Sequence, residues 1–148
     1  MGDYKKILVA VDFSPVAEKV IGQAVELAKR YDARLLFLHV VEYVPPIDVG
    51  YEPVTPATWM VDETLLVENA KTSLHDFVSK LQLNNAVQRV EVGIPKHTIA
   101  EIAMQENVDL IVIGSHGRHG LDRLLGSTAN GVLHNAKCDV LAVRVQDG

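Results

Sequence analysis

The sequence predicts an α/β fold, an open five-stranded parallel sheet with helices on both faces. Five apolar runs alternate with helical patterns along the chain, and this alternation is typical of parallel strands joined by right-handed helical crossovers. The first run, Ile7–Val11, is continuously apolar and rich in β-branched residues, which indicates a strand buried on both faces. With 148 residues and 48% hydrophobic content, we expect one domain, residues 1–148, around a single core.

The first helix and the second strand follow directly. Ser14 and Pro15 suit the N-cap and the first helical position, so a helix is expected to start there and to end near Arg30–Tyr31. The run Leu35–Val41 predicts a second buried strand. The inward stripe of the helix has helical spacing and consists of Val16, Val20, Ala24, Leu27 and Ala28.

A long loop and a long helix come next. The stretch Glu42–Thr58 contains four prolines and a glycine, which predicts an irregular loop, and we expect it to overhang a binding site. From Trp59 to Leu83 apolar residues recur at helical spacing, which predicts an amphipathic helix. The residues of that stripe are Val61, Leu65, Leu66, Ala70, Leu74, Phe77, Val78 and Leu81.

The remaining elements complete the alternation. Val87–Val92 alternates polar and apolar residues, as an edge strand does. The other predicted elements are a helix over Pro95–Glu106, a strand over Leu110–Ile113, a helix from Ser127 to about Ala136 and a strand over Asp139–Val145. The last strand is long and carries little charge, so as an exposed sheet edge it would invite pairing with a second copy.

Composition excludes several classes of protein. A net charge of −5 argues against a nucleic-acid surface, which needs clustered lysine and arginine. The lone Cys138 excludes an internal disulfide and cannot by itself form a zinc site. The short apolar run near the start meets Asp12, so we expect neither a signal peptide nor a membrane span. These features predict a cytoplasmic protein with neither nucleic acid nor membrane as partner.

The segment Ile111–Thr128 points to a ligand. An apolar strand breaks there into a glycine-rich, basic loop and then enters a helix, and such loops turn backbone N–H groups and a helix N-terminus toward phosphate. Parallel sheets bind ligands beyond the carboxyl ends of their strands, where the strand order reverses. If the first strand lies beside the fourth, Asp12 and Gly114 face each other at that place. The candidate phosphate-binding residues are Gly114, Gly117, Gly126, Ser127 and Thr128, with charge from Arg118 and Arg123.

Other interpretations of these residues stay open. The glycine-rich segment is equally compatible with a capped connection, and its spacing fits neither a Walker A loop nor the dinucleotide fingerprint. His116 and His119 could contact phosphate or a metal, but two imidazoles without a nearby carboxylate or thiol are weak evidence for a metal. His39 lies inside a strand, where a satisfied core histidine is expected, and His134 and Cys138 are expected to be packing residues.

Three segments together resemble the universal stress protein family. They are Lys5–Ser14, Leu38–Glu42, and Ile113–Gly120 followed by Gly-Ser-Thr at 126–128, and the resemblance extends to the C-terminal strand. It implies a Rossmann-like, adenine nucleotide alpha hydrolase-like sheet of strand order 3-2-1-4-5 and a homodimer joined through Asp139–Val145. In nucleotide-binding members the acidic residue after strand one and the backbone after strand two hold adenosine. Those positions are Asp12 and Val40 here.

The family's phosphate motif, Gly-x2-Gly-x9-Gly-Ser/Thr, falls on Gly114, Gly117, Gly126 and Ser127, with Thr128 beside it. This chain has eight residues between Gly117 and Gly126 instead of nine. The shorter spacing either leaves the amides in place or rotates Ser127 away from the phosphates. Part of the family has the fold without binding ATP.

Two functions therefore remain. The first is a regulator in the stress response that binds ATP or AMP, with or without Mg²⁺, and acts on an unknown protein partner. The alternative is a nucleotide-independent stress-response dimer that acts through protein contacts. No candidate base or pair of metal-binding carboxylates stands out, so we expect a non-enzyme, with ATP hydrolysis slow and incidental at most.

Overall fold

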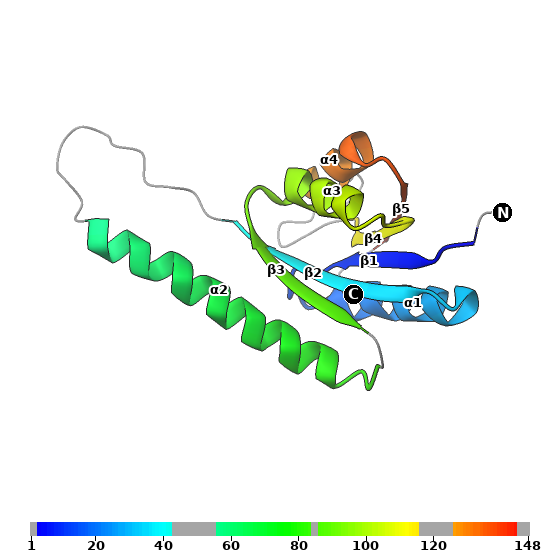
Figure 1. Cartoon of the computed structure of the whole chain (residues 1–148), viewed down its shortest axis with the longest axis horizontal. Helices are drawn as coiled ribbons and strands as arrows, with labels where there is room; N and C mark the ends of the chain where they lie inside the picture. The colour runs from blue at the N-terminus through cyan, green and yellow to red at the C-terminus, as the bar shows by residue number, and fades with distance from the viewer. Residues whose placement is uncertain (1–2, 43–55, 84–85, 116–125, 145–148) are drawn as a thin grey trace.

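The structure is a computed structural model that describes residues 3–42, 56–83, 86–115 and 126–144. Strands and helices alternate through these ranges (Figure 1). The strands are β1 (Lys6–Ala10), β2 (Arg34–Val41), β3 (Val87–Val92), β4 (Leu110–Gly114) and β5 (Asp139–Val143). The helices are α1 (Ala17–Tyr31), α2 (Pro56–Ser79), α3 (Pro95–Gln105) and α4 (Ser127–Asn135).

The strands form one parallel five-stranded sheet of order β3-β2-β1-β4-β5, as predicted. In the centre Ala10 pairs with Leu38 of β2, and Val9 pairs with Val112 of β4. The chain first adds strands on one side of β1 and then crosses to the other side. The strand order therefore reverses at β1, with β2 and β4 as its neighbours.

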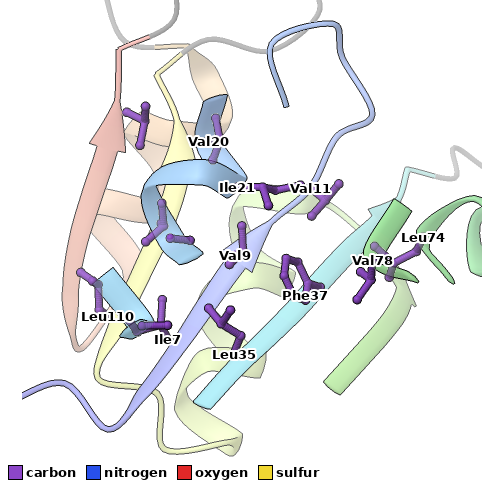
Figure 2. Close-up of a cluster of buried hydrophobic side chains, with 14 residues drawn as sticks. Ile7, Val9, Val11, Val20, Ile21, Leu35, Phe37, Leu74, Val78 and Leu110 are labelled. Atoms are coloured by element: carbon purple, nitrogen blue, oxygen red, sulfur yellow. The ribbon is translucent and has the colours of Figure 1, made fainter. Parts of the chain in front are cut away.

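Helices cover both faces of the sheet. On one face, α1 and α2 pack over a cluster that includes Ile7, Val9 and Phe37 from the strands (Figure 2). On the other face, α3 and α4 pack over Leu8, Leu36, Leu38, Ile111 and Ile113. Fully burying one such aliphatic or aromatic side chain contributes about 1.5–3 kcal/mol to stability. Packing of the two clusters thus holds the sheet rigid, and the rigid sheet positions the ends of its strands.

The start of α1 differs from the expectation. The helix begins at Ala17, and its N-cap residue is Val16, with no side-chain cap hydrogen bond, so the predicted cap at Ser14–Pro15 is wrong. The Asp12 carboxylate accepts a hydrogen bond from the Ser14 N–H, and Phe13 has a left-handed backbone with φ of 59°. This tight turn uses the residues that were expected to open the helix. The predicted end near Tyr31 is confirmed.

Helix α2 is displaced from its predicted range. It begins at Pro56, three residues before Trp59, and ends at Ser79, four before Leu83. Proline suits the first helical position because its missing N–H has no partner there in any helix. The predicted loop Glu42–Thr58 is therefore too long at its end, and its residues 43–55 lie outside the described ranges.

The apolar stripe of α2 is only partly inward. Ala70, Leu74 and Val78 are buried, whereas Leu65 and Leu66 are exposed, which corrects the expectation for both leucines. Among the described elements, helix α2 packs mainly against β2 and β3. Its apolar stripe therefore extends beyond the part of the core that the helix covers.

The other boundaries shift by a residue or two. β1 covers Lys6–Ala10, β2 starts one residue early, and β4 extends to Gly114. The predicted C-terminal strand Asp139–Val145 is too long, because β5 ends at Val143 and Arg144 is outside it; Val145 lies beyond the described residues. β3 is at the edge of the sheet, as its alternating sequence predicted.

Candidate functional site

The candidate site lies at the carboxyl ends of β1, β2 and β4, where the strand order reverses. Continuing the register of β1 and β4 by two residues places Val11 opposite Gly114, one residue before Asp12. This is the position at which doubly wound sheets bind ligands. Asp12 and Gly114, predicted to face each other, thus lie at the ends of neighbouring strands, one residue out of register.

Asp12 is held by a local turn. Its Oδ1 accepts a hydrogen bond of 3.0 Å from the Ser14 N–H, which forms an Asx turn across Phe13. The side chain is exposed, and within the described ranges Oδ2 has no hydrogen-bond or ion-pair partner. A carboxylate oxygen held in this way can accept a hydrogen bond from a ligand hydroxyl.

Val40 contributes backbone, because its side chain is buried in the core under α3 and α4. The Leu38 carbonyl accepts from the Val11 N–H at 2.8 Å, and the Val41 carbonyl accepts from the Gly93 N–H at 3.0 Å. Along a parallel strand, the backbone N–H and C=O groups of successive residues form hydrogen bonds alternately with one neighbouring strand and with the other. The Val40 N–H and C=O therefore face the β1 side, opposite Asp12.

β1 has already turned away at this point. Among the described residues, neither the N–H nor the C=O of Val40 forms a hydrogen bond on the β1 side. A donor and an acceptor of the backbone are thus available on the side of β2 from which the chain turns away at Asp12.

His39 is the satisfied histidine that its strand position predicted. Its Nδ1 lies 2.5 Å from the Val11 carbonyl oxygen, and its ring lies 4.4 Å from the Phe13 ring, centroid to centroid. A carbonyl oxygen only accepts hydrogen bonds, so Nδ1 carries the proton.

The two ends of the glycine-rich segment are joined. The Ser115 N–H donates to the Val143 carbonyl at 2.8 Å, and the Ser115 carbonyl accepts from the Gly126 N–H at 2.7 Å. These bonds bring the end of β4 to the start of α4. The predicted site residues His116, Gly117 and Arg118 lie outside the described residues, as do His119 and Arg123.

The N-terminus of α4 is a candidate anion site. Gly126 is the N-cap residue, and no side chain caps the helix. In the part of the chain that the structure describes, the N–H groups of Ser127 and Thr128 have no acceptor. Orphan amides and the positive end of the helix dipole favour a negatively charged group at such a terminus. Ser127 is exposed and Thr128 half-buried, so both are accessible to a ligand.

Two residues next to Asp12 were not identified from the sequence as part of the site. Phe13 takes the left-handed conformation, and the Ser14 Oγ is buried without a hydrogen-bond partner among the described residues. The sequence signal was Asp12 itself, because an aspartate side chain readily accepts a hydrogen bond from the backbone N–H two residues later and so forms an Asx turn. That interpretation competes with the helix cap that was predicted.

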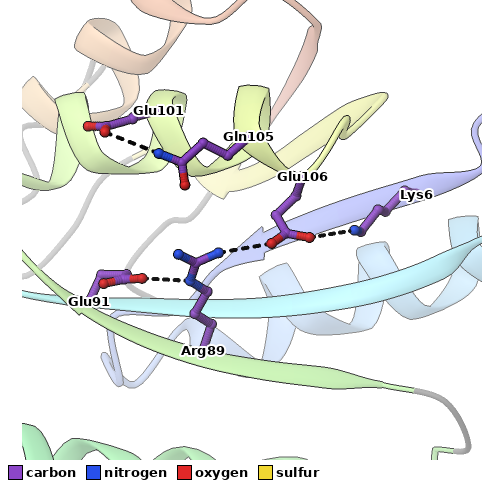
Figure 3. Close-up of polar contacts among 6 residues, drawn as sticks. All are labelled: Lys6, Arg89, Glu91, Glu101, Gln105 and Glu106. Carbon is purple, nitrogen blue, oxygen red and sulfur yellow. Dashed lines mark hydrogen bonds and ion pairs between the residues drawn. The ribbon is translucent and has the colours of Figure 1, made fainter.

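Charged groups outside the site form a separate network. Lys6, the first residue of β1, and Arg89 of β3 both contact the Glu106 carboxylate at the end of α3 (Figure 3). The hydrogen bond from Lys6 lowers the pKa of Glu106. The described residues contain no cluster of three or more His, Cys, Asp or Glu side chains that could hold a metal ion. No helix in the described ranges has the length and apolar character needed to cross a membrane.

Comparisons with known proteins agree on one family. The universal stress protein family model matches residues 3–144. Universal stress protein A homolog 2 of Coxiella burnetii is 44% identical over 147 residues, covering 99% of each chain.

Solved structures give the same result. Universal stress protein UspA from Lactobacillus plantarum is 36% identical, with a TM-score of 0.76 over 97% of this chain and 100% of that one. A universal stress protein in complex with cAMP shares the fold at 23% identity, with a TM-score of 0.66 over 98% and 100% of the two chains. The family model covers nearly the whole chain, a relative is 44% identical along it, and the sheet order is the one expected, so this chain belongs to the universal stress protein family.

Proposed function

We propose that this protein binds an adenine nucleotide, ATP or AMP, at the carboxyl ends of β1, β2 and β4, and acts in the cytoplasm as a regulator of the stress response. The observation that carries the proposal is the set of polar groups left without protein partners there. Within the described ranges these are Asp12 Oδ2, the Val40 N–H and C=O, and the amides of Ser127 and Thr128.

Each of these groups matches one part of a nucleotide. The Asp12 carboxylate can accept from ribose hydroxyls, and the Val40 N–H and C=O can pair with the acceptor and donor edge of adenine. The N-terminus of α4 suits phosphate. Continuing the β1–β2 register two residues past Ala10 and Leu38 would set Asp12 opposite Val40, so ribose and base would bind side by side. The family member solved with cAMP supports an adenine nucleotide as the ligand class.

We propose binding rather than catalysis. Among the described residues, the groups at this edge are the Asp12 carboxylate, the Ser127 and Thr128 hydroxyls and backbone donors and acceptors, all of which can hold a ligand. Release of ADP from ATP should therefore stay near the buffer rate. Turnover at the typical enzymatic rate of about 1–10³ per second would contradict this.

A homodimer joined through β5 is part of the proposal. On the described structure β5 pairs with β4 alone, so its other edge is open. Leu141 of β5 is an exposed apolar side chain on that edge strand. The open edge of β5 also favours the second candidate function, a dimer that acts through protein contacts without nucleotide. The shortened spacing of the glycine motif favours that function as well.

Isothermal titration of ATP and AMP decides between the two functions. In Asp12→Asn the side-chain carbonyl still accepts from the Ser14 N–H, but an NH₂ donor replaces Oδ2. Hydrogen bonds to charged groups contribute about 1.5–3 kcal/mol, so the Kd should rise about tenfold or more. Asp76→Asn, an exposed aspartate on α2, is the matched control and should leave the Kd unchanged.

Gly114→Val tests the end of β4. A valine side chain at the end of β4 would block the close approach of backbone to phosphate that the proposed site needs, so binding should be lost. Circular dichroism of the variant checks that the fold is kept. Absence of heat with wild-type protein at high micromolar nucleotide would contradict nucleotide binding and favour the protein-contact function. Ligand-induced thermal stabilisation checks the same point, because binding to the folded state alone raises the melting temperature.

A further inference from the structure

We propose that His39 is a positioning residue that keeps the Val40 backbone open for the ligand. By donating from Nδ1 to the Val11 carbonyl, its imidazole occupies the acceptor that would otherwise close the next rung of the β1–β2 ladder. The ligand part of this inference rests on the proposed nucleotide site, whereas the ladder part can be tested without any ligand.

The register identifies the missing rung. Ala10 pairs with Leu38, and the Leu38 carbonyl accepts from the Val11 N–H. In a parallel ladder the next rung would join the Val40 N–H to the Val11 carbonyl. Among the described residues that bond is absent, and the Val11 carbonyl oxygen receives His39 Nδ1 instead. A side chain of β2 thus replaces the backbone of β2 as the partner of β1.

The imidazole is held in this position from its other side. The Phe13 ring lies against it with centroids 4.4 Å apart and planes inclined by 37°. Phe13 itself is in the left-handed region, where a residue with a Cβ is strained, and the Asx turn from Asp12 to Ser14 spans it. Strain of this kind persists only where neighbouring contacts enforce it. The Asx turn, the Phe13 ring and the His39 imidazole therefore support one another, and together they direct the chain after β1 away from Val40.

The arrangement also explains why histidine is present at this position of a buried strand. His39 is half-buried on the face of α1 and α2, between the fully buried Phe37 and the buried Val41 along the strand. An apolar side chain would suit that face equally well, but it has no donor for the Val11 carbonyl. With such a side chain, the carbonyl would be left to the Val40 N–H, and the donor proposed for the base would be consumed.

The first test needs no ligand. In His39→Leu the donor is removed, and we expect the Val40 N–H to close onto the Val11 carbonyl. NMR should then detect a scalar coupling across that hydrogen bond, and exchange of the Val40 amide with solvent should slow about tenfold or more. In His39→Asn the side-chain NH₂ lies as many bonds from Cα as Nδ1 does. That variant should keep the Val40 amide unpaired, with the Leu38 amide as internal reference.

The second test measures ATP affinity in the same variants. His39→Leu should raise the Kd about tenfold, while His39→Asn should stay within about threefold of wild type, because a lost hydrogen bond corresponds to a change of this order. If His39→Leu fails to fold, His39→Met, which also lacks a hydrogen-bond donor, takes its place and should raise the Kd by the same factor.

The outcomes separate this inference from the proposed function. No coupling and unchanged exchange at Val40 in the Leu variant would overturn the role of His39, even if wild-type protein binds ATP. A closed ladder with unchanged ATP affinity would overturn it as well. If wild-type protein binds no nucleotide, the proposed function fails, and the Val40 amide alone decides whether His39 holds the strands apart.

Discussion

Glu106 is a single carboxylate that joins three elements. It follows α3 and accepts hydrogen bonds from Lys6 Nζ of β1 at 2.8 Å and from Arg89 Nη1 of β3 at 2.9 Å. Arg89 also contacts Glu91 through Nε at 2.6 Å (Figure 3). The hydrogen bond from Lys6, followed by the charges of Lys6 and Arg89, holds the pKa of Glu106 below its ordinary value of 4.5.

The direction of this shift predicts a pH dependence of stability. Because the folded-state pKa is depressed, ionised Glu106 stabilises the fold above the ordinary value, and this contribution is lost as pH falls through the folded pKa. Urea unfolding should find Glu106→Gln less stable than wild type at neutral pH, with the difference shrinking toward about pH 3. Glu101→Gln is the control, since its carboxylate accepts only from the neutral Gln105 among the described residues. A difference between wild type and Glu106→Gln that is equal at both pH values would contradict the assignment.

Cys138 and His134 were both predicted to be packing residues. Cys138 is half-buried against the α3 and α4 face of the core, and burial raises the pKa of its thiol, so the prediction is confirmed and the thiol stays protonated at neutral pH. His134 is exposed on the last turn of α4, so its prediction is wrong. On a short helix, one residue of offset moves a side chain from the packed face to solvent.

At the scale of elements, glycine sets the approach of α3 to α4. A Cβ built on Gly131 of α4 would lie 2.6 Å from Lys96 Cβ and 2.7 Å from Lys96 Cδ. Lys96 Cβ is fixed to the backbone of α3, so it cannot move aside without moving the helix. Gly22 of α1 is the opposite case, because nothing lies within 4 Å of a Cβ built there.

The two glycines predict opposite results for the same substitution. Gly22→Ala should stabilise the protein by about 0.5–1 kcal/mol, because alanine is the better helix former. Gly131→Ala gains the same propensity but meets overpacking that costs about 1–3 kcal/mol, so it should destabilise. Thermal unfolding of the two variants beside wild type measures the signs. A rise in melting temperature for Gly131→Ala would mean that α3 and α4 separate at little cost.

At the scale of the whole molecule, the open edge of β5 predicts the assembly. Leu141 is 37% exposed on that strand, and a lysine on an edge strand opposes pairing with another chain. Sedimentation should find wild-type protein as a dimer and Leu141→Lys as a monomer. Leu65→Lys, at an exposed leucine of α2, is the matched control and should remain dimeric. A monomeric wild type, or a dimeric Leu141→Lys, would contradict the β5 interface.

The candidate site was only partly accessible from the sequence. Asp12, Gly114, Gly126, Ser127 and Thr128 stand out along the chain because turns and helix starts have local signatures. Val40 came from the family resemblance alone, since nothing in an apolar run distinguishes one valine from the next. The register with β1 explains why its backbone is unpaired.

The sequence by itself determined the alternation of strands and helices, and the family resemblance added the order of the strands in the sheet. Apolar periodicity and chain breakers act between near neighbours, so they are legible without coordinates. Only the tertiary structure decided that Phe13 turns left-handed, that His39 takes the Val11 carbonyl, and that Gly131 admits Lys96. The contacts of His39 and Gly131 join residues far apart in the chain, and the packing of strands and helices creates them. The Asx turn at Phe13 is local, but the packing of its ring against His39 is not.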